Sequence, residues 1–392
     1  MEMISMRRRW RPTLAAVAVA LSALALTACG GSSSSSASAV STASNSDFTS
    51  TNKYQALLPP MYKGLFAPPT GPAVKAPSGK RIWVVDAGLA SSYGVRTADA
   101  VQQAGKKLGW NVNVVDAKFD PNQMLTGFKQ AVAAKAQGII AISVDCPIVT
   151  TGAQEAKNAG IPVVGLETLD CNPSLYSYVV HYYNGASLEQ FDKLWGEWQA
   201  NYVIAKTNGQ AKTILNTETD LQTTRWSAEG NRLALAKCPT CKVVADASFV
   251  GTELGPPLAT KIQQAFIKNP DANSFIPSYD AIMTQGGGAQ AIKATGRMSQ
   301  LVISGGEGSA AGIAQIRDGN GMQACIGESP EWESYTAVDA LVRLFLHRNP
   351  NELDSGNGFQ LCDKTHNLPP ARQAYQPPVN FVADFYKLWG VA

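Results

Sequence analysis

The stretch that decides the fold is Gln137-Gly138-Ile139-Ile140-Ala141-Ile142. Its unbroken run of small and apolar residues is typical of a strand that is buried on both faces of a parallel sheet. Residues 153–159 then have a helical pattern, Gly160 ends it, and a second apolar run follows at 161–166. A strand, a helix and a strand in this order predict a βαβ unit in a parallel sheet.

The same alternation continues on both sides of this unit. Upstream, apolar runs at 82–85 and 112–115 predict two more strands, and residues 93–108 between them have helical periodicity. Downstream, a long helical pattern at 186–206 begins a second series, whose expected strands lie at 213–215, 243–245, 275–276, 301–304 and 322–326. Nine or ten strands would strain one open twisted sheet. We therefore expect an α/β fold with two doubly wound parallel-sheet lobes.

The N-terminus has the organisation of a secretory signal peptide. Four arginines at 7–11 precede an apolar run at 14–28, and Leu26-Thr27-Ala28-Cys29 stands where such a peptide is cut. The run is shorter than the roughly 20 apolar residues that a membrane span needs. The four residues resemble a bacterial lipobox. This resemblance implies a signal peptide at 1–28, a lipid on Cys29, and a protein held outside the cytoplasm at the cell membrane.

The chain after Cys29 is rich in serine and then in proline, without an apolar period. This composition is typical of a flexible tether, which we place at 29–79. The remaining roughly 310 residues are enough for two ordinary domains.

Charge and motif content exclude several classes of function. Without residues 1–28 the chain keeps 29 of its 33 basic and 29 of its 30 acidic residues. A neutral chain without a basic cluster is poorly suited to bind nucleic acid. The three histidines lie far apart in sequence, which predicts no metal site. The Gly286-Gly287-Gly288 run lacks the other residues of a phosphate or dinucleotide loop, so we expect no cofactor.

Six cysteines remain when Cys29 carries a lipid, and an even number suits a compartment in which disulfides form. Fifteen pairings are possible for six cysteines. We favour the pairs that are nearest in sequence or in the expected fold, which are Cys146 with Cys171, Cys238 with Cys241, and Cys325 with Cys362. The Cys238-Pro239-Thr240-Cys241 spacing also occurs in thiol oxidoreductases, which is the enzyme alternative. Here it follows a helix instead of beginning one, so no helix N-terminus lowers the thiol pKa.

Several segments resemble the sugar-binding receptors of bacterial ABC importers, the ribose-receptor-like branch of the type I periplasmic binding proteins. They are Lys107-Leu108-Gly109, residues 137–142, residues 158–164, and Ala294-Thr295-Gly296 before Leu301-Val302-Ile303. The resemblance covers about 80–362. It implies an N-terminal lobe at 80–182 plus 329–352 and a C-terminal lobe at 183–328 plus 353–392, joined by three hinge crossovers with the ligand between them.

The same resemblance implies a function in transport. Such receptors capture a solute, close around it like a hinge, and present it to a membrane permease. It implies a monosaccharide or polyol as ligand, an ABC permease as partner, a monomer, and no catalysis. A cyclic signal molecule or an amine stays open as the ligand, and a sensor ectodomain stays open as a second partner.

Ligands of open α/β sheets bind beyond the carboxyl ends of the strands. Aromatic, acidic and polar residues follow the expected strands and are our candidate ligand contacts: Tyr93, Asp145, Glu167, Arg225, Trp226, Ser227, Phe249, Tyr279, Asp280, Glu307 and Glu328. Structural roles compete with binding at several of them, because Asp145 could cap a helix and Trp226 and Phe249 could pack in the core.

Three of these candidates are glutamates at ligand positions of the family. Glu167 and Glu307 stand where aspartates are usual, and Glu328 stands where a hinge-side glutamine is usual. They predict a pocket of hydrogen-bond acceptors that suits polyhydroxylated or cationic solutes. The same pocket would repel carboxylates and phosphates unless Arg225 points inward.

Overall fold

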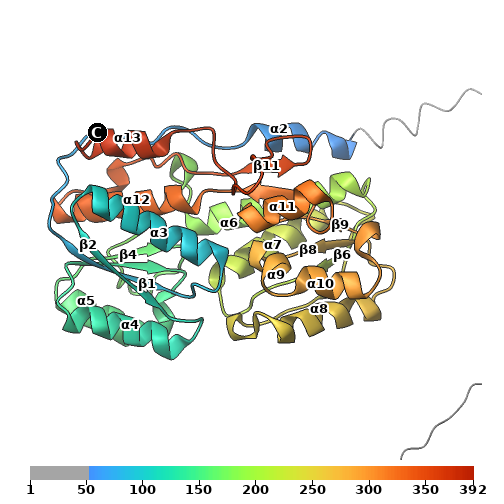
Figure 1. Ribbon diagram of the computed structural model, residues 1–392, viewed down its shortest axis with the longest axis horizontal. Helices are drawn as coiled ribbons and strands as arrows, with labels where there is room; N and C mark the ends of the chain where they lie inside the picture. The colour runs from blue at the N-terminus through green and yellow to red at the C-terminus, as the bar shows by residue number, and fades with distance from the viewer. Residues whose placement is uncertain (1–52) are drawn as a thin grey trace, which may run out of the picture. The chain divides into compact units, whose positions relative to one another are not determined.

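A computed structural model describes residues 53–392 of the chain (Figure 1). The expected signal peptide, the lipid on Cys29 and residues 29–52 of the expected tether lie outside the described residues. Within residues 53–392, no helix combines the length and the apolar character needed to cross a membrane.

The first lobe is built on a parallel sheet with strand order β2-β1-β3-β4-β5. Its strands are β1 (Arg81–Asp86), β2 (Asn111–Asp116), β3 (Gly138–Ile142), β4 (Val163–Leu166) and β5 (Tyr178–Val179). Helices α4 (Pro121–Ala133) and α5 (Thr150–Asn158) cover one face, while α3 (Ser92–Lys107) and α12 (Pro330–Phe345) cover the other (Figure 1). Strand β3 is paired on both sides and fully buried, which confirms the prediction made from residues 137–142.

The second lobe is built on a parallel sheet with strand order β7-β6-β8-β9. Its strands are β6 (Lys212–Leu215), β7 (Lys242–Asp246), β8 (Ser274–Ile276) and β9 (Val302–Ile303). Its helices are α6 (Leu188–Lys206), α7 (Gln222–Ala236), α8 (Pro256–Lys268), α9 (Asp280–Thr284), α10 (Gly288–Ala294) and α11 (Ala310–Asp318). Two doubly wound sheets in series confirm the expected fold class.

A separate antiparallel ribbon follows the second sheet. Strand β10 (Ala324–Gly327) pairs with β11 (Gln360–Asp363), and not with the parallel strands before it. Cys325 lies opposite Cys362 in this ribbon, and the two are joined by a disulfide. Because β10 leads directly into α12, the ribbon stands where the chain returns from the second lobe to the first.

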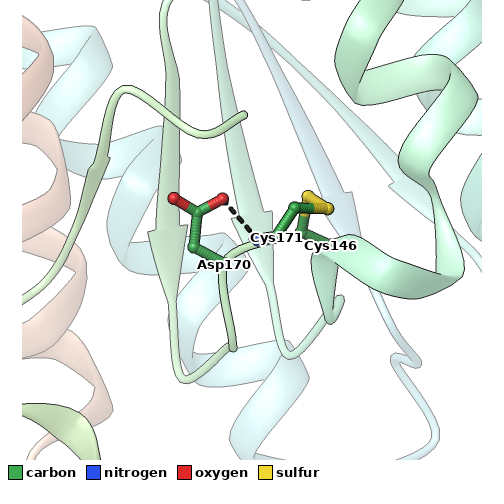
Figure 2. Close-up of side chains that lie close together, drawn as sticks. All are labelled: Cys146, Asp170 and Cys171. Carbon is green, nitrogen blue, oxygen red and sulfur yellow. Dashed lines mark hydrogen bonds between the residues drawn. A yellow bond between two sulfur atoms is a disulfide. The ribbon is translucent and has the colours of Figure 1, made fainter. Parts of the chain in front are cut away.

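The other two disulfides also join the pairs favoured by sequence. Cys238 and Cys241 are bonded just after α7. Cys146 is bonded to Cys171 beside Asp170 (Figure 2). Asp170 accepts backbone hydrogen bonds from Leu175 and Tyr176, at 3.1 and 2.9 Å. Both sulfurs at this place are bonded to each other, so neither is a thiolate that could bind a metal.

Residues 53–79, here called the N-terminal strap, differ from the expected tether because they belong to the fold. Pro59 and Pro60 open the short helix α2 (Leu58–Lys63), as prolines at the first helical positions do. Leu58 and Met61 are buried in the core. The strap backbone then donates to other parts of the chain, from Leu65 to Phe359, from Thr70 to Asp354 and from Val74 to Leu388.

The C-terminal helix α13 (Phe381–Leu388) also differs from its expected place in the second lobe. Its aromatic side chains pack on α12, where Phe381 stacks on Trp332 with ring centroids 5.0 Å apart. Trp389 stacks on Tyr335 in the same way. Burial of these large apolar surfaces holds the chain end on the first lobe. The other lobe boundaries stay a prediction.

A buried ion pair joins the strap, α12 and the chain end. Arg343 donates to Asp339 at 2.5 Å, and neither side chain is exposed. The Trp389 indole donates to Asp339 at 2.9 Å, and Arg343 donates to the Pro72 carbonyl at 3.3 Å. Both charges are therefore compensated inside the protein, which a buried charge requires.

We expect Arg343→Met to destabilise the protein by about 3–5 kcal/mol, because it leaves the Asp339 carboxylate buried without its partner. Urea unfolding of the variant and the parent measures this difference. The matched control is Arg343→Met combined with Asp339→Leu, which removes both charges and should recover much of the loss. A single variant as stable as the parent would contradict the role given to the pair.

Candidate functional site

A cavity of about 90 Å³ lies between the two lobes. One water needs roughly 10–15 Å³ on this measure, so the space holds several waters or a small solute. Both lobes contribute to its wall, which is formed by Asp86, Ala87, Gly88, Ser91, Tyr93, Gly94, Phe119, Ser143, Glu167, Asp192, Trp195, Glu218, Leu221, Thr223, Thr224, Ser227, Ser278, Tyr279, Glu307 and Glu328.

The wall is acidic and rich in hydroxyl groups. Its carboxyl groups belong to six residues: Asp86, Glu167, Asp192, Glu218, Glu307 and Glu328. None of its twenty residues is Lys, Arg or His. Eight hydroxyl side chains, the rings of Phe119 and Trp195, and four small or aliphatic residues complete it. The site therefore offers many hydrogen-bond acceptors and no positive charge.

Most of these side chains stand at the carboxyl ends of strands. Asp86 ends β1, Ser143 follows β3 and Glu167 follows β4. In the second lobe, Glu218 follows β6 and Ser278 follows β8. Ser143 and Glu167 have φ values of 52° and 49°. This left-handed conformation is costly for residues with a Cβ and is concentrated at functional sites.

Glu167 is held by Tyr182, whose hydroxyl donates to it at 2.5 Å. Burial raises the pKa of Glu167 to about 7, although the Tyr182 hydrogen bond acts in the opposite direction. A carboxyl group in this state changes its charge near neutral pH.

Two further wall acids, Asp192 and Glu328, interact with Glu167 and with Glu333, which is buried and is not part of the wall. Burial and the charges of Glu333 and Glu167 hold the pKa of Glu328 well above its ordinary range. Burial raises the pKa of Asp192 in the same way, with Glu167 and Glu328 adding to the effect. Tyr93 reaches this group, because its hydroxyl donates to Glu333. Like charges at short range cannot all ionise, so these acids share protons when the cavity is empty.

Glu307 connects the two lobes. Its Oε1 accepts from the Ser92 hydroxyl of the first lobe at 3.1 Å, and its Oε2 accepts from the Asp280 backbone of the second lobe at 2.9 Å. The Asp280 carboxyl lies behind the wall and accepts from the Gly306 and Ser309 backbones. Asp280 therefore positions the Glu307 loop and does not face the cavity.

Glu218 and Asp86 complete the acidic wall, and neither was expected from the sequence. Tyr279 donates to Glu218 at 2.7 Å, and the Gly88 backbone donates to Asp86 at 2.8 Å. Burial raises the pKa of each of these two acids to about 7. Both stand at strand ends, so the placement rule used for Glu167 could have found them.

The expected contacts divide into two groups. Six of them line the cavity: Tyr93, Glu167, Ser227, Tyr279, Glu307 and Glu328. Five do not: Asp145, Arg225, Trp226, Phe249 and Asp280.

Asp280 has been described above, and each of the other four residues outside the wall has a structural role. Asp145 accepts from the Leu169 backbone and, across the lobes, from the Gln222 backbone at 3.2 Å. Arg225 turns to the Thr219 carbonyl at 2.5 Å and is exposed. Phe249 is buried in the core of the second lobe, and Trp226 packs against the main core.

Helices α6 and α7 supply the contacts that sequence reasoning missed. Asp192 and Trp195 come from α6, and Thr223 and Thr224 come from α7. The two helices touch backbone to backbone, since a Cβ on Gly196 would lie 1.9 Å from the Ser227 carbonyl oxygen. The rule that ligand contacts follow strand ends does not apply to residues inside helices, so it could not point to these four.

Comparisons with known proteins give one family. Residues 84–348 match the model of the periplasmic binding protein domain. No curated protein sequence matches the chain.

Solved structures share the fold at low identity. The glucose-galactose binding protein GanP from Geobacillus stearothermophilus is 20% identical with a TM-score of 0.64, over 75% of this chain and all of that chain. An ABC transporter solute binding protein from Mycobacterium smegmatis with bound glycerol is 18% identical with a TM-score of 0.63, over 76% and 100%. One from Actinobacillus succinogenes with bound D-allose is 18% identical with a TM-score of 0.62, over 73% and 98%.

The family match covers well over half of the chain, and the two-lobed fold with its interlobe cavity agrees with it. The chain therefore belongs to the periplasmic binding protein family, whose members are solute-binding proteins of transport systems.

Proposed function

We propose that the protein is an extracytoplasmic receptor that encloses a small polyhydroxylated solute, a monosaccharide or polyol, and delivers it to an ABC permease. The observation that carries this proposal is the cavity wall, which combines six carboxyl groups with eight hydroxyl side chains from both lobes. A carboxylate can accept two hydroxyl hydrogen bonds, and the wrong ligand would leave these buried groups unpaired.

Contacts between the lobes around the cavity support a closing receptor. The Ser92 to Glu307 and Gln222 to Asp145 hydrogen bonds cross from one lobe to the other. A Cβ on Gly251 would lie 3.2 Å from Phe119 Cβ, so these two segments also meet. Closure removes the solute from water, which is where such receptors gain affinity.

The N-terminal residues support a location of this receptor at a membrane. A lipid on Cys29 would hold the protein on the outer side of the membrane that contains its permease. The proposal rests on the lipobox pattern at Leu26-Thr27-Ala28-Cys29 and on the family.

Replacement Cys29→Ser should release the protein from the membrane, because the acylated thiol would be absent and no helix within residues 53–392 is long and apolar enough to cross a membrane. Fractionation of bacterial cells that express the full chain measures the change, and the parent chain is the control. Membrane association of both chains would contradict lipid anchoring.

Binding of a polyhydroxylated solute should raise the melting temperature of the full Cys29→Ser chain. A ligand at 100 times its Kd adds about 2.7 kcal/mol of stability. A thermal-shift screen of monosaccharides and polyols checks this. For the solute found, Glu167→Gln should weaken binding at least tenfold because it replaces an acceptor oxygen, while Glu155→Gln on the exposed side of α5 should not. No shift with any member of the panel would contradict the proposed function.

Stability of the empty protein should fall as the pH rises from 5 to 8. Asp86, Glu167 and Glu218 have pKa values of about 7 in the folded protein, above their ordinary values near 4. The folded state therefore binds more protons than the unfolded state between these values, and stability decreases with pH there. Urea unfolding at pH 5, 6, 7 and 8 measures the slope.

Glu167→Gln removes one of these titrating groups and should reduce the slope, whereas Glu155→Gln should leave it unchanged. An unfolding midpoint that is constant or rises from pH 5 to 8 would contradict the stated pKa shifts.

A further inference from the structure

We propose that the solute carries a positive charge, as an amine-bearing polyol or amino sugar does. This inference rests on the proposed function and narrows the class of ligand. It follows from the balance of charge in the wall and from two buried oxygen atoms there that have no partner.

The charge balance of the wall is one-sided. Six acids and no base surround the cavity. Arg96 is a base outside the wall whose charge acts on Glu328, and both of its hydrogen bonds, at 2.8 Å, go to Glu331. Arg225, which could have balanced the site, is exposed and bound to the Thr219 carbonyl. The acids that share protons in the empty cavity could ionise beside a cation, whereas a neutral solute brings no charge that compensates theirs.

Two fully buried side-chain oxygen atoms of the wall have no hydrogen-bond partner among residues 53–392. They are Oδ2 of Asp86 and Oδ2 of Asp192. Asp86 is 1% exposed and Asp192 is 7% exposed, so water reaches neither side chain freely. A buried acceptor without a donor costs free energy of about 1–3 kcal/mol. An ammonium group offers three donors and a charge, which matches what these oxygens lack.

The arrangement of the acids favours an extended organic cation over a metal ion. Among the described residues, only Cys146, Asp170 and Cys171 bring three possible metal-ligand atoms within 4.8 Å of one another. None of these three residues lines the cavity. No three wall acids therefore bring carboxylate oxygens within 4.8 Å of one another, whereas Ca²⁺ and Mg²⁺ need several oxygen ligands at about 2.0–2.6 Å. A solute with an amine and several hydroxyl groups can reach acids that stand apart.

Calorimetry with matched pairs of probes tests the charge. The pairs are D-glucosamine with D-glucose, D-galactosamine with D-galactose, and serinol with glycerol, each at pH 6.5 with the full Cys29→Ser chain. We expect at least one amine to bind ten times more tightly than its neutral partner. N-acetylation of that amine should abolish the preference, because it removes the charge and keeps the ring.

Asp192→Asn provides the test at the residue level. It keeps the size of the side chain and removes the charge, so it should weaken amine binding at least tenfold and leave neutral binding nearly unchanged. Glu328→Gln is the second variant, and Glu155→Gln is the control.

The outcomes separate the inference from the proposed function. If the neutral partners bind equally or more tightly, the inference that the solute is positively charged is wrong, and the proposed sugar receptor stands. If the protein binds Ca²⁺ or Mg²⁺ and none of the amines, the inference of an organic cation is wrong. Failure of every probe, together with a thermal-shift screen without any shift, overturns the proposed function and the inference with it.

Discussion

The burial of six carboxyl groups around one cavity is the constraint on which the rest of this structure depends. Burial removes hydration from these groups, and the protein supplies fixed donors to some of them. Tyr182 donates to Glu167, and Tyr279 donates to Glu218. Tyr182 is buried and Tyr279 is half-buried, and each belongs to the same lobe as the acid to which it donates.

The two sheets provide positions for these acids because parallel strands end at a common edge. Glu167 after β4 and Glu218 after β6 stand at such edges in different lobes. Only contact between the lobes brings the two edges together, and Glu307 takes part in it by accepting from Ser92 and Asp280 at once. On the proposed function, Glu307 would contact the solute as well as join the lobes, and it would thereby connect occupancy of the cavity to closure.

Sequence reasoning predicts those parts of the site that follow from backbone periodicity. The strand at 137–142 and the strand-end acids Glu167 and Glu307 could be predicted because a parallel sheet places such residues at one edge. The sequence does not show that Phe249 lies in the core and Phe119 lines the cavity, since both follow strands. Only their packing in the structure distinguishes them. Asp192 was missed because its helix α6 gives no local indication of which polar residue turns inward.

The N-terminal strap shows how a membrane anchor would act on a receptor of two lobes. The strap begins near the second lobe, where Tyr54 packs beside Cys238, and it reaches the end of α13 on the first lobe through Val74. Between Cys29 and residue 53 lie 24 residue steps, which span at most about 80 Å. On the proposed anchoring, this length keeps the receptor within reach of a permease. Because the strap contacts both lobes, a force transmitted from the lipid anchor through the strap would affect the closure of the lobes as well as their position.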